Sequence, residues 1–175
     1  MASKFMGIDM SQEWPDLWIW ETFFNENPIR TFVELGTGVG GMTLLFALQC
    51  YQRGIEFHTF DNQTFFDFSH GLSALLNIRP RFHFVDLFSR EGINQMTEII
   101  ALSPHPLAIF FDDGDKPHEW RLFAPLTSPG DFCIVHDWGT EFLDKDLGDV
   151  AVERILADLS DARPAGWKAM WFKRV

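Results

Sequence analysis

Two apolar segments near the middle of the chain each end in residues that can perform acid–base or metal chemistry. The segments are residues 107–111 and 132–135, and charged or polar side chains follow each of them directly. These side chains belong to Asp112, Asp113, Asp115, Lys116, His136 and Asp137. Carboxylate oxygens and an imidazole nitrogen can hold a divalent cation. A lysine beside such a cation can take up a proton if its pKa is depressed.

A glycine-rich stretch earlier in the chain has the composition of a ligand-binding turn. Residues 32–43 read Phe-Val-Glu-Leu-Gly-Thr-Gly-Val-Gly-Gly-Met-Thr, an apolar strand followed by glycines and then a helix. Gly36, Gly38 and Gly41 also fit the dinucleotide pattern G-x-G-x-x-G, so the glycines do not decide between ligands. Glu34 does, because a carboxylate here repels a pyrophosphate and attracts a ligand with an ammonium and a sulfonium group.

Alternating strands and helices must position these residues. The apolar patterns predict strands at residues 31–35, 55–61, 81–85, 107–111, 132–135 and 167–173. They predict helices at residues 11–25, 42–53, 69–76, 89–102, 118–126 and 150–159. This order predicts an α/β fold with a mostly parallel twisted sheet, right-handed crossovers and helices on both faces.

The chemically suggestive residues fall at the ends of these strands, where ligands of such a sheet bind. They are Glu34, Asp61, Asp86, Asp112, Asp113, His136 and Asp137. Asp61 follows the last glycine by about 20 residues, which is typical of a carboxylate that accepts hydrogen bonds from ribose hydroxyls. A carboxylate in an ordinary surface turn is the alternative for Asp61.

The composition indicates a folded domain without membrane or secretion signals. We expect one domain over residues 1–175, with 46% apolar residues for its core. No apolar run approaches the roughly 18 residues of a membrane span, and the N-terminus lacks the apolar segment of a signal peptide. Cys50 and Cys133 lie in apolar segments, so we expect a cytoplasmic chain without disulfides. The net charge of −11 argues against nucleic acid as a partner.

The glycine-rich turn resembles motif I of the class I S-adenosylmethionine (SAM) methyltransferases, (E/D)-x-G-x-G-x-G. The resemblance implies a Rossmann-like methyltransferase fold with SAM as cofactor. That fold usually ends in two strands after the fifth, whereas one is predicted here, so the C-terminus looks short. The residues expected to contact the cofactor are Glu34, Gly36, Thr37, Gly38, Gly40, Asp61, Asp86, Leu87 and Asp113.

In these methyltransferases a carboxylate at the end of the third strand commonly accepts a hydrogen bond from the adenine amino group. The resemblance gives this role to Asp86, with Leu87 and Phe88 as an apolar wall for the ring. An aspartate that only caps the following helix is the alternative.

The charged segments resemble the cation-dependent O-methyltransferases, which include the catechol, caffeoyl-CoA and macrolide-sugar enzymes. Asp113 to Lys116 matches their D-x-x-K motif, and His136-Asp137 stands at their second ligand pair. The resemblance implies that Asp113, His136 and Asp137 hold a divalent cation, Mg²⁺ or Mn²⁺, and that Lys116 is the general base. It implies a SAM-dependent O-methyltransferase that acts on a hydroxyl group of a small molecule.

Several of these assignments have alternatives. His136 stands where the enzymes usually have a carboxylate, so it can be a metal ligand, a metal-independent base or a residue that only ends the strand. Asp112 and Asp115 compete with Asp113 for the ligand position. Lys116 can instead form a surface ion pair with Asp112 or Asp115.

Two other functions remain compatible with the sequence, namely an NAD-type oxidoreductase and a SAM-binding module without transferase activity.

Three aromatic side chains near the charged segments are candidates either for an acceptor pocket or for ordinary packing, namely His118, Trp120 and Trp138. The remaining histidines show no partner spacing and are expected to be structural, and they are His58, His70, His83 and His105.

Overall fold

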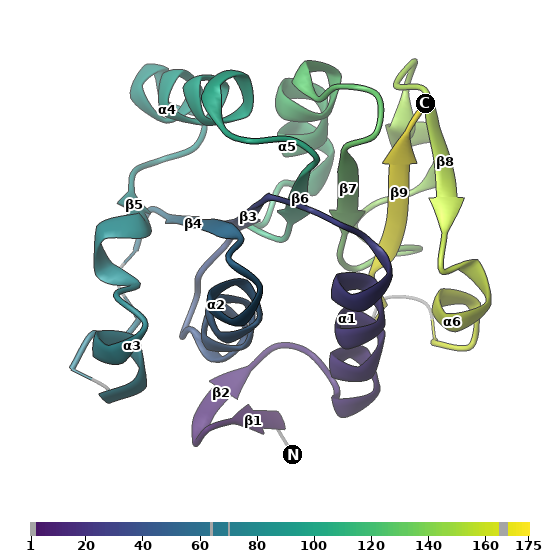
Figure 1. The fold of residues 1–175 in the computed structure, drawn as a ribbon. Coiled ribbons are helices and arrows are strands. Elements are labelled where there is room, and N and C mark those ends of the chain that lie inside the picture. Colours follow the sequence, from purple (N-terminus) through teal and green to yellow (C-terminus); the bar gives the residue numbers. More distant parts are fainter. Residues whose placement is uncertain (1–2, 64, 70, 165–167) are drawn as a thin grey trace.

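A seven-stranded sheet with helices on both faces forms the body of the protein (Figure 1). The computed structural model describes residues 3–63, 65–69, 71–164 and 168–175. From edge to edge the strands are β5 (Phe82–Phe84), β4 (Glu56–Asp61), β3 (Thr31–Leu35), β6 (Leu107–Phe111), β7 (Phe132–Val135), β9 (Met170–Arg174) and β8 (Val152–Ile155). All of them run parallel except β9, which pairs antiparallel with both β7 and β8.

The helices lie in two layers, one on each side of the sheet (Figure 1). One layer contains α1 (Trp14–Glu26), α2 (Gly41–Arg53), α3 (Gly71–Leu75) and α6 (Ala157–Asp161). The other contains α4 (Arg90–Leu102) and α5 (Lys116–Phe123). Three short 3-10 helices are η1 (Arg79–Arg81), η2 (Ala124–Leu126) and η3 (Asp144–Leu147). An N-terminal hairpin of β1 (Ser3–Phe5) and β2 (Ile8–Met10) packs against α2.

Local sequence signals explain where the helices begin and end. Pro15 lies in the first turn of α1, where its missing N–H has no partner to lose. The Ser89 hydroxyl accepts a hydrogen bond of 3.0 Å from the Gly92 N–H and so caps α4. Gly54 ends α2 in the left-handed conformation, with φ +67°. Each of these three helix ends thus carries a residue type that favours its position.

Apart from the short 3-10 helix η1, the predicted order of elements is confirmed from α1 to β7, and β3, β6 and β7 have the predicted bounds. The helix predicted at residues 150–159 is wrong, because β8 occupies Val152–Ile155 and only the short helix α6 follows. Pairing of β8 with β9 overrides the helical spacing of the apolar residues. Two strands therefore follow β7, and the prediction of a short C-terminus is wrong as well. Residues 165–167, at the start of the last predicted strand, and residue 70 lie outside the described residues.

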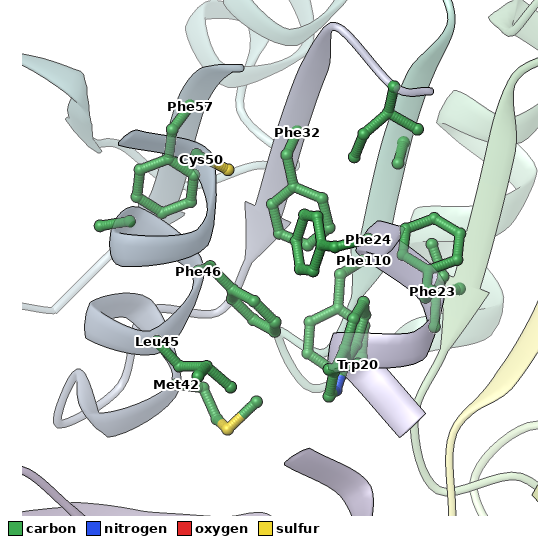
Figure 2. Packing of buried hydrophobic residues seen from close by; sticks show 14 of the residues in the cluster. Trp20, Phe23, Phe24, Phe32, Met42, Leu45, Phe46, Cys50, Phe57 and Phe110 are labelled. Atoms are coloured by element: carbon green, nitrogen blue, oxygen red, sulfur yellow. The ribbon is translucent and has the colours of Figure 1, made fainter. Parts of the chain in front are cut away.

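Aromatic rings fill the space between α1, α2 and the sheet (Figure 2). Trp20 is fully buried, and its ring centroid lies 4.7 Å from Phe46, 4.9 Å from Phe110 and 5.8 Å from Phe32. Most of these contacts are edge-to-face, which aromatic pairs favour. A second core lies on the other face of the sheet, under α4 and α5. The sheet is thus held rigidly from both sides.

Two findings bear on the expectations drawn from composition. Cys50 and Cys133 are buried free thiols, one in each core, which confirms them as small core residues. Within the part of the chain that the structure describes, every helix is too short or too polar to cross a membrane.

Truncation of the central tryptophan should destabilise the fold strongly. Trp20→Ala leaves a cavity among the surrounding rings, so the free energy of unfolding should fall by about 3–5 kcal/mol. Trp18 lies on the same helix with 60% of its surface exposed, so Trp18→Ala should change the free energy of unfolding by less than about 0.5 kcal/mol. Urea unfolding followed by circular dichroism measures both variants. Equal losses in the two would contradict the assignment of Trp20 to the centre of the core.

Candidate functional site

A cavity of about 690 Å³ lies beyond the carboxyl ends of β3, β4, β6 and β7. Its walls are the glycine-rich turn after β3, the turns after β4, β6 and β7, and the connection between β2 and α1. This is the edge of a parallel sheet where ligands are expected. Among the residues that the structure describes, seven acidic and two basic ones line it, namely Asp9, Glu34, Asp61, Asp112, Asp113, Asp137, Glu141, Lys116 and His136.

Glycines allow the turn after β3 to lie close to the end of β6. Gly36 has φ +94°, and a Cβ atom added there would overlap the carbonyl of Asp112. Gly40, the N-cap of α2, has φ +91°, and a Cβ there would overlap the ring of Phe66. Both positions therefore require glycine for conformation and for space.

Glu34 is a buried carboxylate without a cationic partner. Its side chain is 1% exposed, and its Oε2 accepts hydrogen bonds of 2.7 Å from the hydroxyls of Thr43 and Thr59. Burial raises the pKa of Glu34 to about 8, although the two hydroxyl bonds work in the opposite direction. In the described part of the chain, no lysine, arginine or histidine forms an ion pair with it. A cationic ligand in the cavity would lower this pKa and favour the ionised carboxylate.

Asp61 ties the end of β4 to the glycine-rich turn. Its Oδ2 accepts a hydrogen bond of 2.7 Å from the Gly38 N–H, and its Oδ1 accepts one of 2.8 Å from the Gln63 N–H. The side chain borders the cavity, as predicted for a ligand-binding carboxylate. Thr37 also lies in the wall, and its hydroxyl contacts that of Thr59 at 2.5 Å.

The residues predicted to hold an adenine ring lie in the turn before α4, where the charge of Asp86 is close enough to contribute to the raised pKa of Asp113. The carboxylate of Asp86 accepts a hydrogen bond of 2.9 Å from the Phe88 N–H, in the turn before α4. Leu87 is buried in the core beneath α4 and α5. Phe88 stacks on His118, with ring centroids 4.4 Å apart. These residues are not among those that line the cavity in the described part of the chain.

Asp112, His136 and Asp137 form the group that could hold a metal ion. The Nδ1 atom of His136 lies 3.1 Å from Asp112 Oδ1 and 3.2 Å from Asp137 Oδ2. The predicted set contained Asp113, with Asp112 as a competing ligand, and the structure brings Asp112 to the two other residues. Successive side chains of an extended segment point to opposite sides, which separates these two neighbours. Burial and the nearby charge of Asp61 raise the pKa of Asp113 to about 7.

Lys116 is buried in the same group and contacts three carboxylates. Its Nζ lies 2.7 Å from Glu141 Oε2, 3.0 Å from Asp137 Oδ2 and 3.4 Å from Asp112 Oδ1. Burial lowers the pKa of Lys116, but these carboxylates outweigh burial and raise it above its ordinary value. A base role requires a depressed pKa, whereas in this arrangement the Lys116 side chain is an ammonium ion.

Burial and neighbouring charges also shift the pKa values of His136 and Asp137 in opposite directions. Burial lowers the pKa of His136, but the charge of Asp112 and hydrogen bonds to both aspartates raise it to about 10. Burial raises the pKa of Asp137, yet its bonds to His136 and Lys116 bring it down to about 2. Asp137 also has φ +54°, a conformation that aspartate tolerates better than most residues. The group thus combines carboxylates with two internal cations.

Two contributions to the site were not predicted. The hairpin of β1 and β2 brings Asp9 and its neighbours to the cavity wall, and a Cβ on Gly41 would overlap the carbonyl of Asp9. Met6 and Gly7 both have positive φ, and this Met-Gly pair was the available signal for a tight hairpin. Glu141, in the turn after β7, had no comparable signal because no motif includes it.

Most of the remaining aromatic and histidine candidates that the structure describes pack in the core or contact neighbouring side chains. Trp120 and Trp138 belong to the second core, with the Trp120 Nε1 donating to the Leu147 carbonyl at 3.1 Å. His58 Nδ1 lies 3.0 Å from His83 Nε2, so these two histidines do have a partner spacing. His105 contacts the carboxylate of Asp131, at 2.8 Å to Oδ1. His70 lies outside the described residues.

Comparison with known proteins supports the fold. No protein-family model and no curated protein matches the sequence. A structure of CmcI with Mg and SAM superposes with a TM-score of 0.72 at 17% identity, covering 99% of this chain and 76% of that chain. The O-methyltransferase TomG from Streptomyces achromogenes, in complex with SAM, gives 0.58 at 13% identity, with 95% and 82% coverage.

An RNA methyltransferase from Salinibacter ruber, in complex with S-adenosyl-L-homocysteine, gives a TM-score of 0.55 at 12% identity, with 93% and 92% coverage. The chain therefore has the Rossmann-like fold of the SAM-dependent methyltransferases, which confirms the predicted fold class. At these identities the likeness concerns the fold, and the chemistry has to be argued from the site.

The buried carboxylate of Glu34 should make stability depend on pH. Its folded pKa of about 8 lies above the ordinary 4.5, so its ionisation opposes folding. That penalty is absent below about pH 4.5, grows as the pH rises and is complete above about pH 8. Glu34→Gln stays neutral and should be more stable than the wild type by about 1–3 kcal/mol at pH 9, with little difference at pH 5.

Urea unfolding at the two pH values measures this difference. Glu98 is an exposed carboxylate on α4, and Glu98→Gln serves as the control that should show no such gain. A stability difference for Glu34→Gln that is the same at pH 5 and pH 9 would show that Glu34 is not a buried, destabilising charge.

Proposed function

We propose that the protein binds SAM in this cavity and transfers its methyl group to a hydroxyl group of a small molecule. The observation that carries the proposal is Glu34, a buried carboxylate without a cationic partner beside the glycine-rich turn of a methyltransferase fold. The ammonium and sulfonium groups of SAM would supply the missing positive charge. The SAM complexes of CmcI and TomG, which share this fold, support the same cofactor here.

The charge of the cavity argues for SAM over a dinucleotide and for a small acceptor over RNA. Seven carboxylates against Lys116 and His136 leave the lining strongly negative. A pyrophosphate, a coenzyme A ester or an RNA backbone would be repelled there. An uncharged or cationic acceptor would not be repelled. This favours an O-methyltransferase of small molecules, although one structural neighbour is an RNA methyltransferase.

The cofactor contacts follow from the walls of the cavity. Gly36, Gly38 and Gly40 let a ligand approach the main chain, and Thr37 adds a hydroxyl group. Asp61 has carboxylate oxygens at the wall that can accept hydrogen bonds from the ribose hydroxyls in addition to the main-chain bonds they already accept. The adenine role of Asp86 remains a proposal, and it requires the ring to extend beyond the cavity toward α4.

The residues at the other end of the cavity would act on the acceptor. Lys116 and His136 place positive charge where the acceptor oxygen would sit, which favours its deprotonated form. Asp113, whose pKa is raised to about 7, can receive the proton that the acceptor loses. Transfer of the methyl group is then an in-line displacement that depends mainly on positioning.

A divalent cation fits the donor set of this group. Asp112, His136 and Asp137 offer two carboxylate oxygens and one imidazole nitrogen within 4.8 Å of one another. A nitrogen ligand suits Mn²⁺ or Fe²⁺ better than Mg²⁺. When bound, such an ion would lower the pKa of the acceptor hydroxyl group.

A SAM-binding module without transferase activity was suggested by the apparently short C-terminus. Strands β8 and β9 remove that reason, because the sheet has both strands that usually follow the fifth. Turnover measurements separate the two functions.

Loss of the Asp61 carboxylate should weaken cofactor binding. We expect S-adenosylhomocysteine to bind with a micromolar dissociation constant, about −8 kcal/mol. Asp61→Ala should weaken it by roughly 1.5–3 kcal/mol, because charge-assisted hydrogen bonds to the ribose are lost. Calorimetric titration measures both values, with NAD as the competing ligand. Unchanged affinity in the variant would exclude the ribose role, and preferential binding of NAD would exclude the proposed function.

Substitution of Lys116 should affect turnover and not cofactor binding. Lys116→Ala should lower turnover by about 10²–10⁴-fold with almost unchanged affinity for S-adenosylhomocysteine. Because the structure holds Lys116 as an ammonium ion, Lys116→Arg should retain more activity than Lys116→Ala. Methyl transfer from radiolabelled SAM to an acceptor found by screening phenols and sugars measures the rates. If the arginine variant is as inactive as the alanine variant, Lys116 must lose its proton and acts as the base.

A further inference from the structure

Lys116 already occupies the place that a divalent cation would take between Asp112 and Asp137. Asp112 Oδ1 lies 3.1 Å from His136 Nδ1 and 3.4 Å from Lys116 Nζ. Asp137 Oδ2 lies 3.2 Å from the same Nδ1 and 3.0 Å from the same Nζ. The four atoms thus form a closed ring in which carboxylate oxygens and nitrogen atoms alternate. A metal ion held by both carboxylates would meet the ammonium group at a separation where two positive charges repel strongly.

Glu141 offers the ammonium group a partner outside this ring. Its Oε2 lies 2.7 Å from Lys116 Nζ, the shortest of the three ion pairs of that group. The Glu141 side chain is 54% exposed, whereas that of Lys116 is 4% exposed. Lys116 can therefore withdraw from Asp112 and Asp137 toward Glu141 and remain paired.

We propose that the Lys116 ammonium group is the resident cation of this site and competes with a divalent cation for Asp112 and Asp137. Glu141 is the positioning residue that holds the ammonium group when the divalent cation binds. The inference rests on the proposed function only in taking Asp112, His136 and Asp137 as the cation ligands. Lys116 then sets the affinity for the metal, and the site keeps its charge balance when the metal is scarce.

Manganese binding to the full chain tests the competition without any need for turnover. Free Mn²⁺ is measured by electron paramagnetic resonance for the wild type and for Lys116→Met, which keeps the length of the side chain and removes its charge. Lys116→Met should bind Mn²⁺ about tenfold more tightly or better, because the competing cation is gone. The Lys168 side chain pairs at 3.5 Å with Asp161, a carboxylate that does not line the cavity, and Lys168→Met should leave the affinity unchanged.

Glu141→Gln gives a second variant that should fold even if Lys116→Met does not, because its side chain is half exposed. It should weaken Mn²⁺ binding by about threefold or more, since the ammonium group then has only Asp112 and Asp137 as partners. In a Lys116→Met background the same change should have a clearly smaller effect, because Glu141 acts through Lys116.

Titration with S-adenosylhomocysteine separates failure of this inference from failure of the proposed function. Normal binding of that ligand together with Mn²⁺ affinity that does not rise in Lys116→Met overturns the competition. Unchanged or tighter Mn²⁺ binding in Glu141→Gln overturns it as well. Absence of S-adenosylhomocysteine binding in the wild type overturns the proposed function, whatever the manganese result.

Discussion

The concentration of carboxylates at one edge of the sheet is the constraint on which the rest of the site depends. Seven acidic side chains line a single cavity, and most of them come from strand ends or the turns that follow. Like charges at such short range are tolerated only if protons, hydrogen-bond donors or cations compensate them. Helix α5 supplies one such cation because it begins at Lys116. Its N-cap, Asp115, accepts a hydrogen bond of 3.1 Å from the His118 N–H, which fixes that start.

A rigid scaffold is needed to hold these charges so close together. The strands that carry the site run through the middle of the sheet and are fully buried. Aromatic clusters around Trp20 and Trp120 pack on opposite faces of them. Repulsion among the carboxylates therefore acts against packing that cannot easily relax, which is how a folded protein can keep unfavourable charge at a functional site.

The sequence predicted those features of the fold that depend on local signals. Continuous apolar runs located β6 and β7, and the glycine-rich turn located the end of β3. The edge strand β8 was missed because its four residues acquire their strand character only by pairing with β9. The apolar side chains within residues 150–159 follow helical spacing, and no residue of that segment argued against a helix.

The candidate site was predicted at the level of segments and only partly at the level of atoms. The sequence brought His136 and Asp137 together with the turn after β6, but it could not decide between Asp112 and Asp113. That choice depends on the direction in which the chain leaves the strand, which is a three-dimensional property. The upward pKa shift of Lys116 depends in the same way on three carboxylates from two different turns, namely those of Asp112, Glu141 and Asp137.

The two ends of the cavity compensate negative charge in opposite ways. Glu34 is surrounded by threonine hydroxyls, which stabilise a carboxylate but carry no charge of their own. Asp112 and Asp137 share the ammonium group of Lys116. Without a ligand, the first end avoids a buried charge by keeping a proton on Glu34, whereas the second end is balanced by a cation of the protein itself. A cofactor with positive charge gains most at the Glu34 end, and any cation that enters the other end must first displace a group of the protein itself.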